Sequence, residues 1–300
     1  MPYFHLSGGG LVFLGALFWS LNSPLIKFIS LDSIFVCSLR AAIAAVALGA
    51  FIRPKQLKWN GWMLLYVCSY AALCLSVVAA LKMTSAPIAV GMQYSSIIWL
   101  FLGTTLWTRR VNLKALLPVG VILMGVVFFM CSGTDATSTT GNLIALAEGV
   151  FFAVMTISAK RVTRTNPIGM VAVANVFTAV VAFAISPAEL AALPAMTTLD
   201  WVVMLVLGVV QVGGGYSFYN MGVMKVSPQK ASVIALWEMI LGPVWVAAFL
   251  GEIPSMLELI GFVIIIIGIF MDSKMNAEET TPVEEPARRQ AFLKVPPIAT

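Results

Sequence analysis

Charged residues are scarce in this sequence: Asp, Glu, Lys and Arg together make up only 10% of its 300 residues. A soluble domain is nearer a quarter charged, which excludes an ordinary soluble protein. The strands of alternating polar and apolar residues that a membrane β-barrel needs are also absent. Apolar residues, 60% of the total, fill the chain instead, in runs of about 20. A helix of that length crosses a membrane, so the composition predicts an all-α integral membrane protein.

Histidine and cysteine are also sparse. His5 is the only histidine, and the four cysteines lie in apolar runs without the spacing of metal ligands. No Gly-x-x-x-x-Gly-Lys motif for ATP occurs. We therefore expect no metal, no cofactor and no enzymatic activity, because an intramembrane enzyme would need a nucleophile–base pair or a metal cluster in its spans.

Ten apolar runs predict ten transmembrane helices joined by short connections. After the last run, residues 273–300 are charged and proline-rich, and we expect a disordered cytoplasmic tail there. The predicted helices occupy approximately residues 9–30, 33–52, 60–81, 86–107, 113–131, 141–162, 167–186, 200–222, 229–250 and 256–272.

Lysine and arginine are distributed unequally between the two sides of this arrangement. If the N-terminus lies inside, the outer connections hold only Lys27 and Lys82 as bases, and the cytoplasmic connections hold most of the others. We therefore expect both termini in the cytoplasm, and Lys27 and Lys82 to reach the membrane surface. The net charge of +5 reflects this bias and does not indicate a nucleic-acid partner.

The chain carries a weak internal repeat. Lys225–Glu252 aligns without a gap on Lys82–Arg109, 143 positions earlier (225 − 82). The alignment predicts two five-helix repeats, 1–131 and 141–272. Since five is odd, the repeats would be inverted in the membrane, which is a transporter architecture. The same offset aligns further pairs: Ile265 with Ile122, and Gly268 with Gly125.

Two acids fall inside apolar runs. Glu238 lies in the middle of the ninth run, with Gly242 on the same helix face, and Glu148 lies about a third of the way through the sixth. A carboxylate at this depth is costly and usually faces a cavity or a partner. Either acid could contact a substrate amine or carry a proton. The alternatives are a structural carboxylate for Glu238 and an acid that reaches water at the outer mouth for Glu148.

Aromatic and amide side chains accompany these acids in runs one, four, eight and nine. Such a set can hold an apolar or aromatic side chain and its polar head, although ordinary helix packing explains any single member. Arg40, the only base well inside a run, is expected to pair with an acid or to reach the membrane surface. The candidate substrate-binding residues are Trp19, Asn22, Gln93, Tyr94, Trp99, Glu148, Gln211, Tyr216, Tyr219, Trp237 and Glu238.

Two motifs carry a family resemblance. Trp19–Lys27 reads WSLNSPLIK, and Glu238 is followed fourteen residues later by Glu252 after a glycine. In these features residues 1–272 resemble the drug/metabolite transporter superfamily, in particular its ten-span EamA-type exporters. The chain departs from the pattern at Pro243, which is displaced from the acid. It also departs in the first half, where Ser95 and Arg109 stand at the acid positions.

The resemblance implies a carrier of the cell inner membrane, closest to exporters of amino acids and metabolites. Its partners would be a small-molecule substrate and the lipid bilayer, with protons as candidate coupling ions, and the chain would be a monomer or weak dimer. Spans 1, 3, 4, 6, 8 and 9 would line a central cavity, and spans 2, 5, 7 and 10 would lie outside. Spans five and ten should therefore contribute little to any polar cavity.

The expected function is secondary transport, by alternating access. The solute would be an amino acid, including aromatic or other apolar ones, or a related small metabolite, which is exported or allowed to pass. The alternative is an antiporter of nucleotide sugars or organic phosphates, which would need paired bases at mid-membrane to hold phosphate. An intramembrane enzyme is the least favoured class.

Overall fold

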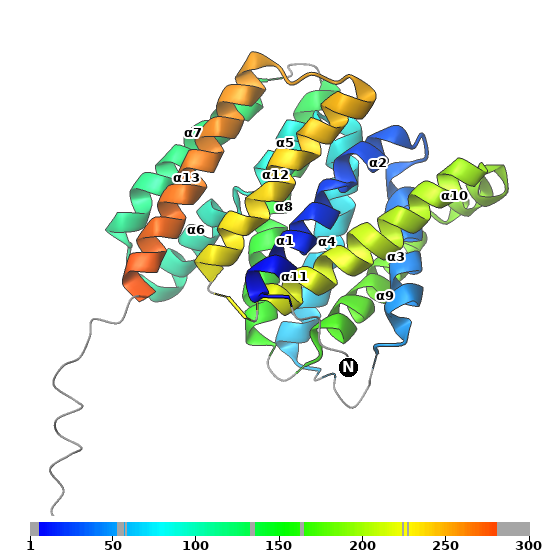
Figure 1. The fold of residues 1–300 in the computed structure, drawn as a ribbon, viewed down its shortest axis with the longest axis horizontal. Helices are drawn as coiled ribbons and strands as arrows, with labels where there is room; N and C mark the ends of the chain where they lie inside the picture. Colours follow the sequence, from blue (N-terminus) through cyan, green and yellow to red (C-terminus); the bar gives the residue numbers. More distant parts are fainter. Residues whose placement is uncertain are drawn as a thin grey trace, which may run out of the picture.

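The first half of the chain forms helices and short connections in the computed structural model (Figure 1). The structure describes residues 6–52, 57, 59–132, 136–162, 165–223, 225–226 and 228–280, and these contain helices but no strand. The first-half elements are α1 (Gly8–Ser20), α2 (Asn22–Phe28), α3 (Ser33–Gly49), α4 (Gly61–Met83), α5 (Ala86–Gln93), α6 (Ser96–Thr108), the short helix η2 (Leu113–Ala115) and α7 (Leu116–Cys131).

The second half continues in the same way. Its elements are α8 (Ala136–Arg161), α9 (Pro167–Ile185), the 3₁₀ helix η3 (Pro187–Ala195), α10 (Thr198–Leu205), the π-helix η4 (Val206–Gly214), α11 (Gly215–Val223), α12 (Pro228–Leu250) and α13 (Met256–Thr280). These elements follow the predicted apolar runs in order, and the all-helical class is confirmed. Since α13 extends to Thr280, residues 273–280 of the predicted tail are helical, and residues 281–300 lie outside the described part.

Eight helical segments of the described chain are long and apolar enough to cross a membrane. They include α1 with α2, α5 with most of α6, and the continuous segment from α10 to α11. Two further apolar helices are shorter, Ser33–Gly49 and Ile234–Leu250. Length and composition therefore support a multi-pass membrane protein, as the sequence predicts.

Two of the segments are interrupted near their middle. α1 ends at Ser20 because Pro24, four residues on, has no N–H to donate to the Ser20 carbonyl. Between α5 and α6 the backbone tightens, with the Tyr94 N–H on the Gly91 carbonyl at 3.1 Å and the Ser95 N–H on the Met92 carbonyl at 3.0 Å. Broken helices inside a bundle expose polar backbone and side chains to its centre.

The helices pack in pairs that join the two halves. α4 packs along α8, α3 along α9, α7 along α13, and α1 along both α11 and α12. The contact between α1 and α11 is close, because a Cβ on Gly215 would lie 2.5 Å from Trp19 Cδ1. Helices of both halves therefore meet around α1, near the centre of the molecule (Figure 1).

The pair α7–α13 is reciprocal. A Cβ on Gly125 would lie 2.6 Å from Ile265 Cγ1, and a Cβ on Gly268 would lie 2.5 Å from Ile122 Cγ1. The sequence repeat aligns these residues with one another, glycine with glycine and isoleucine with isoleucine. Each half thus presents the same glycine and isoleucine to the other, as in an interface with two-fold symmetry.

We predict that Gly125→Ala destabilises the protein, because the added methyl group would overlap Ile265 and lie 2.9 Å from the Gly261 carbonyl oxygen. Overpacking of this kind costs about 1–3 kcal/mol. Gly120 on the same helix is exposed and has no neighbour within 4 Å of its Cβ position. Gly120→Ala should therefore stabilise by up to about 1 kcal/mol. Thermal unfolding of both variants in detergent tests the contact, and equal melting temperatures would contradict it.

Candidate functional site

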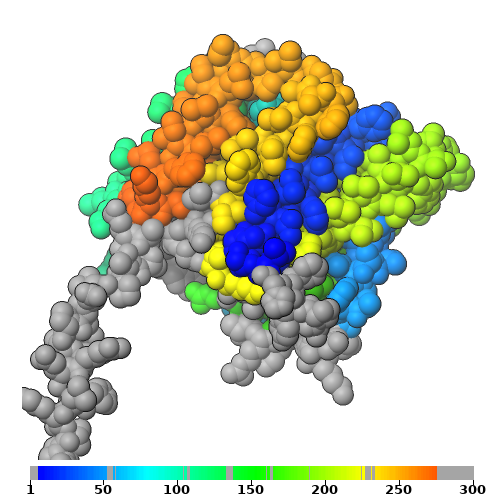
Figure 2. Space-filling model, viewed as in Figure 1, coloured from blue at the N-terminus to red at the C-terminus, as the bar shows by residue number. Residues whose placement is uncertain are grey.

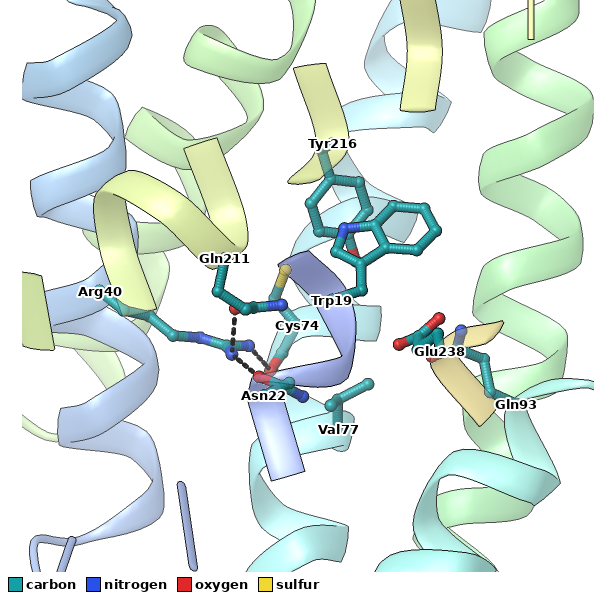
Figure 3. A pocket seen from close by; sticks show the side chains of 9 residues that line it. All are labelled: Trp19, Asn22, Arg40, Cys74, Val77, Gln93, Gln211, Tyr216 and Glu238. Carbon is teal, nitrogen blue, oxygen red and sulfur yellow. Dashed lines mark hydrogen bonds between the residues drawn. The ribbon is translucent and has the colours of Figure 1, made fainter. Parts of the chain in front are cut away.

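A small polar cavity lies at the centre of the bundle (Figure 3). Its free volume is about 10 Å³, enough for roughly one water molecule, so the site is closed around its own side chains. Helices of both halves contribute to it. The lining residues are Trp19, Asn22, Arg40, Cys74, Val77, Gln93, Gln211, Tyr216 and Glu238.

Arg40 of α3 supplies the positive charge of the cavity. It is only 3% exposed. Its guanidinium donates to the Asn22 side-chain oxygen at 2.8 Å, to the Cys74 carbonyl oxygen at 3.0 Å and to the Gln211 side-chain oxygen at 3.5 Å. All three acceptors are neutral, so these hydrogen bonds orient the guanidinium without neutralising its charge. A buried, uncompensated cation is costly, and an anion of suitable size would stabilise it.

Glu238 of α12 supplies the negative charge and is 7% exposed. One carboxylate oxygen lies 3.4 Å from the Tyr94 hydroxyl, which also donates to the Ala235 carbonyl oxygen at 2.8 Å. In the close-up view, Glu238 and Arg40 lie on opposite sides of Trp19 and Asn22 (Figure 3). The described residues form no ion pair between the two. The cavity therefore presents a carboxylate at one side and a guanidinium at the other.

Aromatic rings form one wall of the site. The Trp19 ring centroid lies 4.7 Å from that of Tyr216 and 4.5 Å from that of Tyr219, and the Tyr70 and Tyr216 centroids are 4.8 Å apart. The indole nitrogen of Trp19 is buried and has no hydrogen-bond partner. Rings held in this way provide an apolar surface with a free donor beside it.

The structure brings most of the predicted residues together. Tyr94 and Tyr219 lie just behind the lining. The Tyr94 hydroxyl contacts the Glu238 carboxylate, and the Tyr219 ring packs against the Trp19 ring. Trp237 lies elsewhere: it is 46% exposed, and its ring meets Phe13 edge-on at 5.9 Å. Adjacent residues on a helix point in different directions, so Glu238 and Trp237 cannot both face the cavity. Six of the predicted residues line the cavity: Trp19, Asn22, Gln93, Gln211, Tyr216 and Glu238.

Glu148 and Trp99 are also outside the cavity lining, although both carry buried polar atoms. Glu148 is 1% exposed, so it does not reach water at an outer mouth. Neither of its carboxylate oxygens has a hydrogen-bond partner, and the Trp99 indole nitrogen has none either. The structure therefore separates these two predicted residues from the central site.

Arg40, Cys74 and Val77 line the cavity but were not among the predicted residues. Arg40 neither pairs with an acid nor reaches the surface, and it corrects the expectation that span two lies outside. The sequence feature that points to Arg40 as a lining residue is its position as the only base well inside an apolar run. Span six, expected in the lining, contributes no lining residue among those described.

A larger cavity, of about 450 Å³, lies beside α6. Ile97, Phe101 and Thr105 form one wall, and Arg110 and Asn112 lie in the connection that follows α6. Spans five and ten also contribute to it, through Ala115, Val119 and Asp272. Most of the side chains that line this cavity are apolar, so it does not contradict the expectation that these spans contribute little to any polar cavity. The expectation holds for the central site, to which they add no lining residue.

Polar contacts join the two halves at the end of the bundle where α2, α4 and α12 end. Lys27 Nζ lies 2.9 Å from Glu252 Oε2 and donates to the Thr84 carbonyl oxygen at 3.0 Å. The other Glu252 oxygen accepts the Ala86 N–H at 3.3 Å, and Lys82 donates to the Ile29 carbonyl oxygen. Both lysines thus bind protein groups at the ends of their helices. On the face shown in Figure 2, α1 and α2 lie between α12 and α10.

The fold and the site define a multi-pass membrane protein with a closed polar centre. Residues 139–273 match the model of the EamA-like transporter family, which agrees with the resemblance seen in the sequence. The match indicates a membrane transporter of small molecules as the class of protein.

A comparison with solved structures bears on the fold. A solved structure titled "Crystal structure of protein" has a TM-score of 0.63 and 16% sequence identity, covering 91% of this chain and 99% of its own. At that identity the likeness shows the fold alone. No curated protein matches the chain.

Proposed function

We propose that this chain is a secondary transporter that moves amino acids with apolar or aromatic side chains across the cell inner membrane. The carrying observation is the pair of buried charges at one cavity, Arg40 and Glu238, each without a partner of opposite charge among the described residues. A zwitterion satisfies both, with its carboxylate on the guanidinium and its ammonium on the carboxylate. Its side chain lies against Trp19 and Tyr216.

The charges also favour this solute class over the alternative. Nucleotide sugars and organic phosphates carry two or more negative charges on phosphate, which paired bases would hold. Arg40 is the one base in the cavity lining of the described chain, and Glu238 would repel a phosphate. A zwitterion has no net charge and therefore matches a site with one charge of each sign.

Transport proceeds by alternating access between two inverted five-helix repeats, with ten spans and both termini in the cytoplasm. The reciprocal contact of Gly125 and Gly268 supports the two-fold relation between the repeats. The contacts of Lys27 with Glu252 and Thr84 support a gate at the outer end, since they tie the ends of α2 and α4 to the connection after α12. The small central cavity is consistent with a closed conformation, in which both ends must open in turn.

The purified chain in proteoliposomes tests this function. We expect exchange of labelled phenylalanine, and of other apolar amino acids in a labelled panel, with and without a pH gradient. Phenethylamine lacks the carboxylate and 3-phenylpropionate lacks the ammonium. Each should therefore compete with an affinity at least about tenfold lower than that of phenylalanine, because one lost charged hydrogen bond is worth about 1.5–3 kcal/mol. Sugar phosphates moving in place of amino acids would overturn the proposal.

A further inference from the structure

Glu148 on α8 is a buried carboxyl that the proposed substrate site does not use. It is 1% exposed, and neither oxygen has a hydrogen-bond partner. Two more polar atoms without partners lie on the neighbouring turn, Ser95 Oγ and Trp99 Nε1, and Ser95 is fully buried. Buried polar groups are seldom left unpaired, so such a set indicates a ligand that is absent or a group that changes its charge.

Glu148 lies where four helices surround α8, namely α4, α5, α6 and α7. The neighbouring Gly149 shows how closely α8 approaches the start of α6. A Cβ on Gly149 would overlap Ser95 Oγ and lie 3.1 Å from Trp99 Cδ1. No group of three or more His, Cys, Asp or Glu side chains in the described chain could hold a metal ion. The central cavity does not reach Glu148. A proton is the ligand that needs neither a cavity nor a ligand cluster.

The charged surroundings of Glu148 point the same way. None of the titratable side chains on the helices packed against α8 forms a hydrogen bond or ion pair with the Glu148 carboxyl group. Helix α5 packs against both α8, which carries Glu148, and α12, which carries Glu238, and the two carboxylates have the same sign of charge. The surrounding titratable groups are Tyr66, Cys68, Tyr70, Cys74 and Lys82 on α4, Tyr94 after α5 and Cys131 on α7, while α6 carries none within Ser96–Thr108.

We propose that Glu148 is the proton-binding site of this carrier, and that a proton on Glu148 and a substrate ammonium on Glu238 replace one another. The proposal rests on the function proposed above. With the substrate site empty, the two carboxylates repel, and a proton on a Glu148 oxygen removes that repulsion. When an ammonium group binds Glu238, it offsets the negative charge there and Glu148 releases its proton. One solute is thereby exchanged for one proton.

Ser95 and Trp99 would serve both states of Glu148. Their O–H and N–H groups are donors without partners in the closed structure, and a turn of the Glu148 side chain toward them after the proton leaves would give the carboxylate two hydrogen bonds. In the repeat alignment Ser95 stands at the position of Glu238 (238 − 143 = 95). The first half therefore has a hydroxyl where the second half has its acid, and its own acid lies on the adjoining helix α8.

Infrared difference spectroscopy on the full chain in lipid tests the proton site without requiring transport. A pH change should produce a carboxyl band that is lost in Glu148→Gln and kept in the matched variant Glu238→Gln. Glu148→Asp retains a carboxyl group and should keep a shifted band. A band that persists in Glu148→Gln, or no such band in the wild type, would overturn the proposal.

Transport provides the second readout. In proteoliposomes loaded with phenylalanine, Glu148→Gln should lower accumulation driven by a pH gradient about tenfold more than it lowers exchange at equal pH, because coupling is lost while solute binding sites remain. Equal losses, or accumulation driven by a sodium gradient, would contradict proton binding at Glu148. If the wild type moves no amino acid, the proposed function fails, while the infrared bands still decide the role of Glu148.

Discussion

Arg40→Gln is expected to lower transport of phenylalanine about 30-fold or more, because losing one partner of a buried charge pair costs about 2–5 kcal/mol. The guanidinium is held by three neutral oxygens and can orient toward a carboxylate. Glutamine retains hydrogen-bonding capacity but not the charge. The measurement is initial uptake of labelled phenylalanine into proteoliposomes, normalised to the amount of folded protein.

Selectivity separates recognition from folding in this variant. Phenethylamine has no carboxylate, so Arg40→Gln should leave its ability to compete nearly unchanged while competition by phenylalanine falls. Arg40→Lys keeps the charge without the planar fork and should recover part of the loss. Lys114→Gln, at an exposed base of η2, is the matched control and should transport normally. A parallel loss for amine and amino acid would assign Arg40 a structural role.

The sequence predicts the fold well because the bilayer determines the length of each apolar run. The predicted 113–131 corresponds to η2 and α7, and 167–186 to α9. The interruptions inside the spans are harder to predict from the sequence. Pro24 signals the break after Ser20. No proline marks the break at Tyr94, which follows Gly91 by three residues, and the Tyr94 hydroxyl is bound to the Ala235 carbonyl of α12. Such a break depends on a tertiary contact that the local sequence does not contain.

The site was predicted in residue type more successfully than in orientation. Glu238 was identified by charge alone, since a carboxylate in an apolar run needs a cavity or partner. Trp237, the repeat equivalent of Tyr94 (237 − 143 = 94), lies on the exposed side of α12. Which face of α3 carries Arg40 inward depends on packing: a Cβ on Gly208 would lie 2.9 Å from the Arg40 carbonyl oxygen. Helix rotation is therefore the information that a single sequence lacks.

Glu238→Gln is expected to reduce phenylalanine transport about 30-fold or more, by the same cost of about 2–5 kcal/mol for an unpaired charge. Its melting temperature should change little. The Tyr94 hydroxyl makes its shorter bond to Ala235, at 2.8 Å against 3.4 Å to Glu238, and the amide oxygen of glutamine can still accept. Asp32→Asn is the matched control, because Asn also caps the N-terminus of α3.

The sign of the charge makes a sharper test than the size of the loss. Glu238 repels a free carboxylate, so 3-phenylpropionate should compete poorly with the wild type and better with Glu238→Gln, where Arg40 is the remaining charge in the cavity. Phenethylamine should change in the opposite direction and lose affinity in this variant. The two substitutions, at Arg40 and Glu238, should therefore shift selectivity toward amines and toward acids respectively. If 3-phenylpropionate gains nothing in Glu238→Gln, or the variant transports phenylalanine normally, the carboxylate does not bind the ammonium group and the zwitterion assignment fails.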